Sequence, residues 1–88
     1  MNVHFFAAAR AAAGTSSAEV SLEDLKEPTL AALLNYLPTR FTGTTAAGMS
    51  LGQVLAQCSF LIDGESSPAT ASLAGATRVD VLPPFAGG

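Results

Sequence analysis

The sequence of 88 residues is poor in cysteine, histidine, tryptophan and basic residues. Its single cysteine, Cys58, cannot form an internal disulfide. One cysteine together with one histidine, His4, does not provide the three or four protein ligands that a zinc site needs. We therefore expect no disulfide and no bound metal. We also expect no bound cofactor.

Positive charge is scarce. The chain has four Lys and Arg residues against seven Asp and Glu residues, which gives a formal net charge of -3. Proteins that bind nucleic acids use a basic surface to neutralise the phosphate backbone. The composition therefore argues against a nucleic-acid partner.

Long hydrophobic runs are absent as well. No segment approaches the roughly 18 apolar residues that a membrane-spanning helix needs. The first ten residues have no basic n-region, and Arg10 interrupts their apolar run, so they do not have the pattern of a secretory leader. We expect no membrane partner and a cytoplasmic location.

The sequence does contain enough hydrophobic residues, 49% of the total, to form one core. A folded chain of this size buries roughly 63% of the surface that it exposes when unfolded, which suffices for one modest core. The chain therefore reads as one folded domain with no room for a second.

The first third of the chain predicts two strands. β-formers dominate Val3–Ala7 without clean alternation, which is typical of a central strand buried on both faces, and we expect this strand over Asn2–Ala8. Residues Ala9–Ala13 favour a short helical turn, and the cluster Gly14–Ser17 favours a turn. Apolar and polar residues alternate over Ala18–Leu22, so we expect a strand with one face in water, antiparallel to the first.

The middle of the chain predicts two helices. Thr29 can cap a helix whose leucines recur with helical spacing, at Leu30, Leu33, Leu34 and Leu37. Pro38 disfavours helical geometry at the residue before it, so we expect this helix to end at or before the last of these leucines. Ser50 and Gln53 match a capping box, which predicts a second short helix through Gln57.

The last third predicts strands at Ser59–Ile62, closed by an Asp63–Gly64 turn, and at Thr77–Leu82. The order of elements indicates an α+β fold and is compatible with the β-grasp, or ubiquitin-like, roll. In that roll a mixed sheet packs on one main helix, and the first and last strands pair in parallel at the centre. We expect a β-grasp domain over residues 1–82 and a tail over residues 83–88.

No catalytic constellation is evident within the domain. His4 has no neighbouring nucleophile or carboxylate in the sequence, and Cys58 has no nearby cation to lower the pKa of its thiol. We interpret His4 as a strand residue and Cys58 as a small buried apolar residue. Five carboxylates in polar contexts are expected on the surface: Glu19, Glu23, Asp24, Glu27 and Glu65.

The chain ends in an unusual tail, L-P-P-F-A-G-G from Leu82 to Gly88. Two prolines remove backbone donors, so the chain must leave the sheet after Leu82. Six extended residues reach about 20 Å, and Gly87 and Gly88 have no side chains to prevent entry into a narrow cleft. The terminal carboxylate is ionised and unreactive at neutral pH, so it must be activated before it can carry a group. A slender arm that ends in an activatable acid suits a carrier.

Two segments resemble the MoaD family, the small sulfur-carrier subunit of molybdopterin synthase within the ThiS/MoaD superfamily. They are V-H-F-F-A-A-A-R-A-A-A-G from Val3 to Gly14 and R-V-D-V-L-P-P-F-A-G-G from Arg78 to Gly88. The tail is specific to the sulfur carriers, and Phe6–Ala7 with Arg10 and Gly14 narrows the resemblance to this family.

The resemblance implies a β-grasp fold and a cycle of activation. In the family, a MoeB-like activating enzyme adenylates the terminal glycine with ATP, and sulfur transfer then forms a thiocarboxylate. The tail inserts into the large subunit, MoaE, where the sulfur is transferred to cyclic pyranopterin monophosphate. Carried over to this chain, Gly88 bears the sulfur and Gly87 threads the channel. The docked arm then consists of Pro83, Pro84, Phe85 and Ala86.

Three alternatives remain open: a sulfur carrier for thiazole or cysteine biosynthesis, a ubiquitin-like protein modifier, and an interaction domain with an inert tail. We further expect a positive φ at Gly14 and a surface or subunit-facing role for Arg10. Around the base of the tail we expect apolar surface that a partner covers. The candidates for it are Phe6, Phe60, Leu82 and Phe85.

Overall fold

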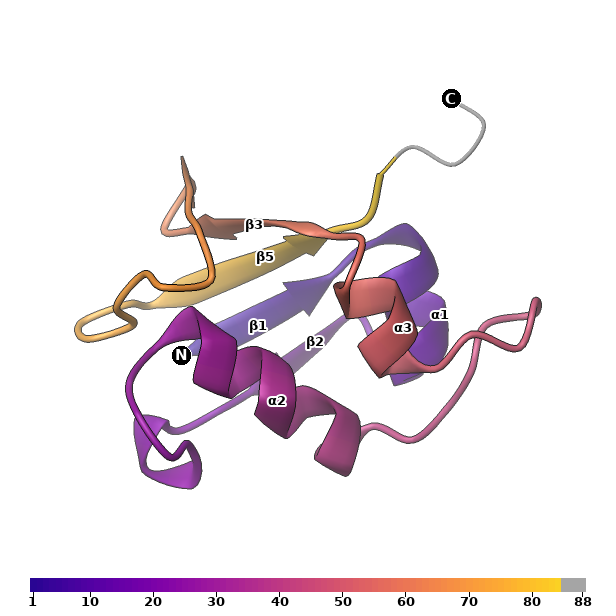
Figure 1. Ribbon diagram of the computed structural model, residues 1–88, viewed down its shortest axis with the longest axis horizontal. Coiled ribbons are helices and arrows are strands. Elements are labelled where there is room, and N and C mark those ends of the chain that lie inside the picture. The colour runs from indigo at the N-terminus through magenta and orange to yellow at the C-terminus, as the bar shows by residue number, and fades with distance from the viewer. Residues whose placement is uncertain (85–88) are drawn as a thin grey trace.

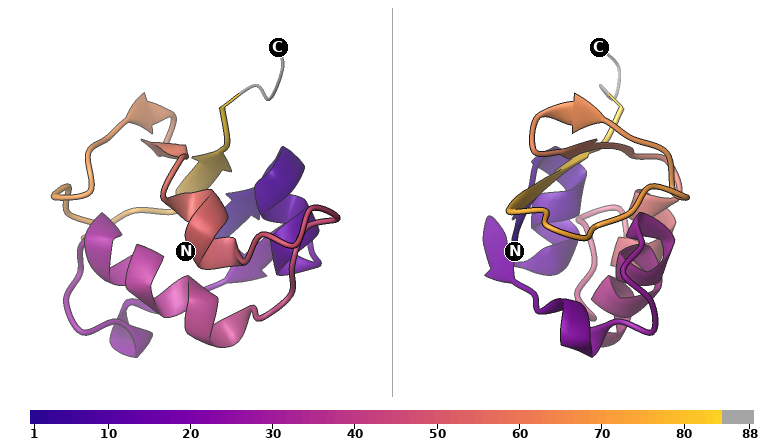
Figure 2. Two further views of the ribbon diagram at one scale, coloured as in Figure 1. Left: turned by 45° about the vertical axis from the view of Figure 1, so that its right-hand side comes forward. Right: turned by 90° about the vertical axis from the view of Figure 1, so that its left-hand side faces the viewer.

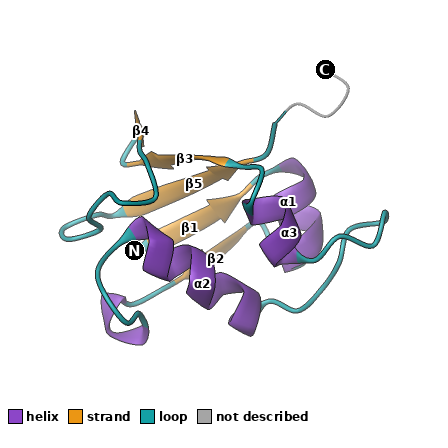
Figure 3. Cartoon of the chain, viewed as in Figure 1, coloured by secondary structure: helices purple, strands orange, loops and turns teal. Residues whose placement is uncertain are grey.

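The structure is a computed structural model, which describes residues 1–84. Within these residues one mixed sheet packs against helices (Figure 3). None of the described helices is long and apolar enough to cross a membrane. In chain order the elements are β1 (Asn2–Phe5), α1 (Ala7–Ala13), β2 (Ser17–Glu19), the 3-10 helix η1 (Leu22–Asp24), α2 (Leu30–Arg40), α3 (Leu51–Leu55), β3 (Ser59–Ile62), β4 (Glu65–Ser66) and β5 (Arg78–Leu82).

The sheet has the strand order β2-β1-β5-β3-β4, with the first and last strands at its centre (Figure 1). Strands β1 and β5 run parallel, with Val3 opposite Val79 and Phe5 opposite Val81. The other neighbours, β2 on β1, β3 on β5 and β4 on β3, are antiparallel. This topology confirms the predicted β-grasp architecture, including the parallel central pair.

The core lies between one face of the sheet and α2. Helix α2 lies across this face of the sheet (Figure 2, right). Alternate residues of the two central strands are buried in one cluster with the leucine stripe of the helix. Thr29 caps α2 as predicted, because its Oγ1 accepts a hydrogen bond of 3.2 Å from the amide of Ala32. The fully or almost fully buried residues of these three elements are Val3, Phe5, Val79, Val81, Leu30, Leu33 and Leu37.

Strand β1 is shorter and less buried than the sequence predicts. It ends at Phe5 instead of Ala8, and Asn2 is exposed and His4 half-buried, so only one of its faces is covered. Ala7 has a φ of 49°, which breaks the strand geometry and starts α1 two residues before the predicted Ala9. The alanine-rich segment is helical because alanine has the highest helix propensity, and this preference overrides β-pairing once Phe5 has been placed.

Helix α2 continues through Pro38 and ends at Arg40, so the predicted end at or before Leu37 was wrong. Proline removes only its own N–H donor, and regular bonding resumes beyond it, with the Phe41 amide donating to the Leu37 carbonyl at 2.9 Å. The ring of Pro38 lies beside α3, where a Cβ added to Gly52 would be 3.6 Å from its Cγ. Packing between the two helices therefore outweighs the local preference of proline.

Helix α3 has the predicted capping box. The Ser50 hydroxyl accepts from the Gln53 amide, and the Gln53 side chain accepts from the Ser50 amide. The helix ends at Leu55, two residues before the predicted end at Gln57. Its buried residues pack into the core, and α1 packs against it near the end of the sheet where β5 finishes (Figure 1).

The strand at Ser59–Ile62 is found with the predicted bounds, and Asp63 and Gly64 form the expected turn with φ values of 48° and 85°. This turn leads into the short strand β4, which the sequence pattern did not indicate. Strand β2 has only three residues, and the second half of the predicted strand at Ala18–Leu22 leads instead into η1. Its antiparallel pairing with β1 is confirmed.

Gly14 has the predicted positive φ, 74°, and closes α1 by donating its N–H to the carbonyl of Arg10 at 2.9 Å. A Cβ at Gly14 would meet nothing within 4 Å, so a substitution is opposed by backbone strain and not by a clash. Gly14→Val should therefore cost about 1–2 kcal/mol, or about 4–16 °C in thermal unfolding of a domain of this size. Gly14→Asn, a residue that tolerates this conformation, should lose less. Equal melting temperatures for Gly14→Val and the unchanged protein would contradict this assignment.

Candidate functional site

The candidate site begins where β5 ends. Leu82 is the last residue of the strand and lies opposite Ser59 of β3, while Pro83 is half-buried and Pro84 exposed. Because β5 lies between β1 and β3, its residues need amide donors, which proline lacks. After Leu82 the chain accordingly leaves the sheet (Figure 1). The predicted site residues Phe85, Ala86, Gly87 and Gly88 lie outside the described residues.

An exposed aromatic side chain lies at the same end of the sheet. Phe6 is 40% exposed and is the only large hydrophobic residue in this class within residues 1–84. Its amide donates to the carbonyl of Val81 at 3.3 Å. Phe6 therefore lies beside the end of the β1–β5 pair, just before the tail begins. The left-handed conformation of the following residue, Ala7, turns the chain into α1 directly after it.

The expected apolar surface is therefore smaller than the four residues predicted for it. Phe6 is exposed and Leu82 is half-buried, which fits the expectation. Phe60 is 8% exposed and belongs to the core, so its assignment to the partner surface was wrong. Strand β3 alternates between the two faces of the sheet, and Phe60 lies opposite Val81 on the inner face.

The outer face of the sheet is polar near its centre. His4 on β1 lies opposite Asp80 on β5, and Arg78 Nε donates to Asp80 Oδ1 at 2.8 Å. The five carboxylates that were expected on the surface are all exposed. Within residues 1–84 no group of three or more His, Cys, Asp or Glu side chains is arranged to hold a metal ion. This surface offers hydrogen bonds and charge for recognition.

Cys58 lies between α3 and β3 and is half-buried. Burial raises the pKa of its thiol to about 11, and the thiol donates to the carbonyl of Val54 at 3.2 Å. Only the thiolate is a good nucleophile, so the group is almost entirely in its unreactive form at neutral pH. Cys58 thus packs against the core and is unreactive as interpreted, but it is half-buried and not fully buried as predicted from the sequence.

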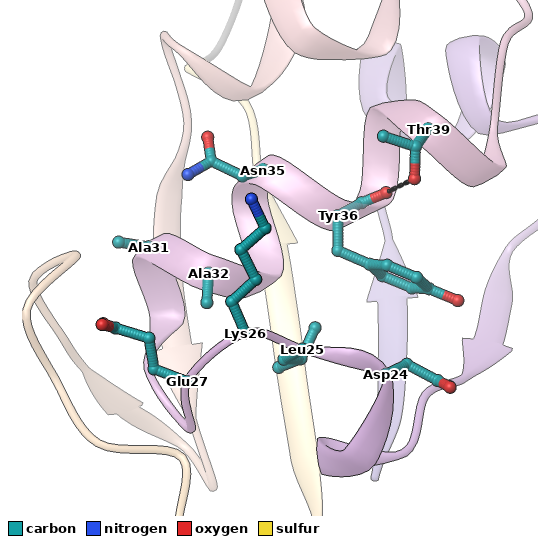
Figure 4. Close-up of a pocket in the computed structure, with 9 residues that line it drawn as sticks. All are labelled: Asp24, Leu25, Lys26, Glu27, Ala31, Ala32, Asn35, Tyr36 and Thr39. Carbon is teal, nitrogen blue, oxygen red and sulfur yellow. Dashed lines mark hydrogen bonds between the residues drawn. The ribbon is translucent and has the colours of Figure 1, made fainter.

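A surface hollow of about 640 Å³ lies far along the chain from the tail (Figure 4). It is formed by the last residue of η1, the segment that follows it and the outer side of α2, and neither β5 nor Pro83 and Pro84 contribute to it. The hollow is lined by Asp24, Leu25, Lys26, Glu27, Ala31, Ala32, Asn35, Tyr36 and Thr39. No sequence motif marks these residues as a group.

Asp63 connects the β3–β4 turn to the start of β5. Its carboxylate accepts hydrogen bonds from Thr77 Oγ1 at 2.7 Å, from the Arg78 amide at 2.9 Å and from the Thr77 amide at 3.1 Å. These bonds fix the first residue of the strand that leads to the tail. The Asp63–Gly64 pair in the sequence predicts only the turn, because the hydrogen-bond partners of Asp63 lie fourteen and fifteen residues away.

These bonds make stability depend on pH. The Thr77 hydroxyl, followed by the Arg78 and Thr77 amides, lowers the pKa of Asp63 from its ordinary value of 3.8. Folding thus favours the ionised form of Asp63. Its contribution to the free energy of unfolding is complete above the ordinary pKa and is lost as the pH falls through the lowered pKa of the folded state. Asp63→Asn should reduce stability at pH 7, and its deficit should shrink below about pH 4. Urea unfolding between pH 7 and pH 3 measures this, with Glu65→Gln as a control. A deficit that stays constant with pH would contradict it.

Comparison with known proteins agrees with this geometry. The described structure is similar to the crystal structure of SAMP1 from Haloferax volcanii, with a TM-score of 0.71 and 18% sequence identity over 99% of this chain and 97% of that chain. At this identity the similarity bears on the fold. No curated protein sequence matches the chain. The sequence matches the ThiS family over residues 3–88, a range that includes both the domain and the tail. The chain therefore belongs to the ThiS family, within the ubiquitin-like ThiS/MoaD superfamily.

Proposed function

We propose that this protein is the sulfur-carrier subunit of molybdopterin synthase, with Gly88 as the residue that carries the sulfur. The observation that carries the proposal is the continuity of the chain from a central strand through Pro83–Pro84 to a terminal Gly–Gly, within a family match that reaches Gly88. Strand β5 is bonded on both sides, so it anchors the arm rigidly at its base. In this proposal the folded domain positions the tail and is recognised by the partners, and the tail carries the reactive terminus.

The proposal assigns the chemistry to the partners. A MoeB-like adenylyltransferase uses ATP to convert the Gly88 carboxylate to an acyl-adenylate and releases pyrophosphate. A sulfur source then displaces AMP, and the terminus becomes a thiocarboxylate. Among the residues that the structure describes, the Cys58 thiol is a poor nucleophile at neutral pH because burial raises its pKa to about 11, which is in keeping with this division.

A large subunit of the MoaE type is the proposed acceptor of the loaded arm. Gly87 and Ala86 have little or no side chain to obstruct a narrow channel. The rings of Pro83 and Pro84 restrict the backbone at the base of the arm, and Phe85 follows them in the sequence. Phe6, exposed beside the end of β5, is available to contact the partner around the mouth of that channel. The pattern Phe6–Ala7, Arg10 and Gly14 favours this branch of the superfamily over thiazole or cysteine pathways.

Intact mass measurement after incubation with the activating enzyme, ATP and a sulfur source tests the proposal. Replacing one carboxylate oxygen by sulfur should raise the mass by about 16 Da, as the acyl-activation chemistry requires. Adding the large subunit and cyclic pyranopterin monophosphate should then remove that increment and yield molybdopterin. Loss of the sulfur only to a thiazole or cysteine pathway would overturn the assignment. So would accumulation of isopeptide-linked conjugates, the product of a protein modifier.

A further inference from the structure

Strand β2 forms one free edge of the sheet. In its antiparallel ladder with β1, Val3 lies opposite Ala18, and Met1 exchanges bonds with Val20, whose amide donates to the Met1 carbonyl at 2.9 Å. Bonded and non-bonded pairs alternate in such a ladder, so the backbone groups of the intervening residues, Ser17 and Glu19, point away from β1. An edge of this kind is a template for a further strand.

Side chains of the same molecule occupy both outward carbonyls of this edge. Thr15 Oγ1 donates to the carbonyl of Ser17 at 3.0 Å. Arg40, the last residue of α2, donates from Nη1 to the carbonyl of Glu19 at 2.7 Å, across 21 residues of sequence. A strand that approached β2 would have to displace this guanidinium, because both need the same acceptor.

The guanidinium of Arg40 is held in place by an aromatic contact. Its central carbon lies 5.1 Å from the ring centroid of Phe41, within the range of a cation–π interaction. Phe41 in turn meets the buried ring of Phe5 edge to face, with centroids 5.5 Å apart and an interplanar angle of 70°. The contacts of Arg40 with Phe41 and of Phe41 with the buried Phe5 therefore hold the guanidinium in place over the edge.

We propose that the outer edge of β2 is a self-association surface that Arg40 keeps closed. Without the Arg40 guanidinium, β2 of one molecule pairs antiparallel with β2 of a second copy, and the two sheets become one. The twofold axis of this pair passes beside Ala18. Each Ser17 then exchanges both backbone bonds with Glu19 of the other copy, and the Thr15 hydroxyl, a rotatable donor, gives up the Ser17 carbonyl to the partner amide.

The edge residues suit a second copy. In the register centred on Ala18, each Glu19 side chain lies opposite a serine, so no like charges face each other directly across the pair. Ala18 and Ser17 are small and leave the approach unobstructed. The opposite edge of the sheet, β4, has only two residues and offers a much shorter template.

Sedimentation velocity over a range of protein concentrations tests the proposal with Arg40→Met, which keeps an unbranched stem and removes every donor. The association constant should rise by at least about tenfold relative to the unchanged protein, since the freed edge groups exchange water for partner bonds. Arg10→Ala, which also removes an exposed arginine, is the matched control and should behave like the unchanged protein.

A second substitution separates edge pairing from nonspecific association. Ser17→Pro removes an outward amide, which an edge strand tolerates, and the double variant Arg40→Met/Ser17→Pro should return to the monomer. Association that survives Ser17→Pro would overturn β2 as the surface, and a monomeric Arg40→Met at every concentration would overturn the role of Arg40. Arg40→Gln, whose amide is too short to reach the Glu19 carbonyl, gives the same readout if Arg40→Met does not fold.

Discussion

Deletion of Gly88 should abolish sulfur transfer while leaving the thermal unfolding of the domain unchanged. The proposed reactive atom is a terminal carboxylate oxygen, and its loss would leave Gly87 as a terminus one residue too short for the activating site. The fold should not respond, because the last residue of a chain contributes little to stability and the core residues nearest to it in sequence, Val79 and Val81, are retained. Mass spectrometry after activation measures the loss of sulfur loading, and calorimetry measures the unchanged unfolding temperature.

Fragmentation of the activated protein supplies the control. The increment of about 16 Da should map to Gly88 and to no other residue, as acyl activation at the terminus requires. Cys58 is the competing site for added mass, as a persulfide or an oxidation product. Its thiol has a pKa of about 11 and is half-buried, so it should remain unmodified. A Cys58 adduct, or molybdopterin formation by the deletion variant, would overturn the carrier proposal.

Elements with strong local patterns were predictable from the sequence. The leucine stripe of α2 and the Ser50–Gln53 capping box each consist of residues within one or two helical turns, so their pattern indicates the structure directly. The alternation in Thr77–Leu82 located β5 with an error of one residue. The parallel pairing of β1 with β5 was expected because the order of elements is compatible with the β-grasp roll, in which the first and last strands pair in parallel.

Features that depend on distant residues were not predictable in this way. Pro38 stays helical because it packs beside Gly52, and neither residue indicates that contact in the sequence. The Asp63 bonds to Thr77 and Arg78 and the Arg40 bond to the β2 edge join residues far apart in the chain. Local pattern fixes local backbone preference, whereas such bonds depend on the finished topology.

The candidate site also has one part that the sequence alone identifies and one part that depends on the fold. Its proposed reactive end is a sequence feature, since the terminal Gly87–Gly88 pair can be identified without knowledge of the fold. Its base is a property of the fold. Phe6 and Phe60 look equivalent in the sequence, but β3 turns Phe60 into the core, whereas Phe6 follows the end of β1 and stays exposed. Partner-facing residues around the tail were therefore only partly identifiable in advance.

Gly87→Val should slow sulfur loading and transfer by roughly 100-fold without changing the stability of the domain. The substitution adds a β-branched side chain next to the proposed reacting centre, where a displacement of about 1 Å costs on the order of 100-fold in rate. Gly87→Ala, with a single added methyl group, should load sulfur at a rate between those of the unchanged protein and Gly87→Val. Single-turnover formation of the thiocarboxylate, followed by mass, measures the effect.

Ala47→Val is the matched control for Gly87→Val. It adds β-branching at an exposed loop residue between α2 and α3, far along the chain from the tail, and should load at the unchanged rate. If Gly87→Val were loaded as fast as this control, the terminal glycines would not enter a narrow site during activation. If it were loaded normally and yet failed to yield molybdopterin, the steric limit would belong to the large subunit alone. A slow step in both reactions is the expected result, because in the proposed cycle the same slender arm enters both partners before the carboxylate or its sulfur reacts.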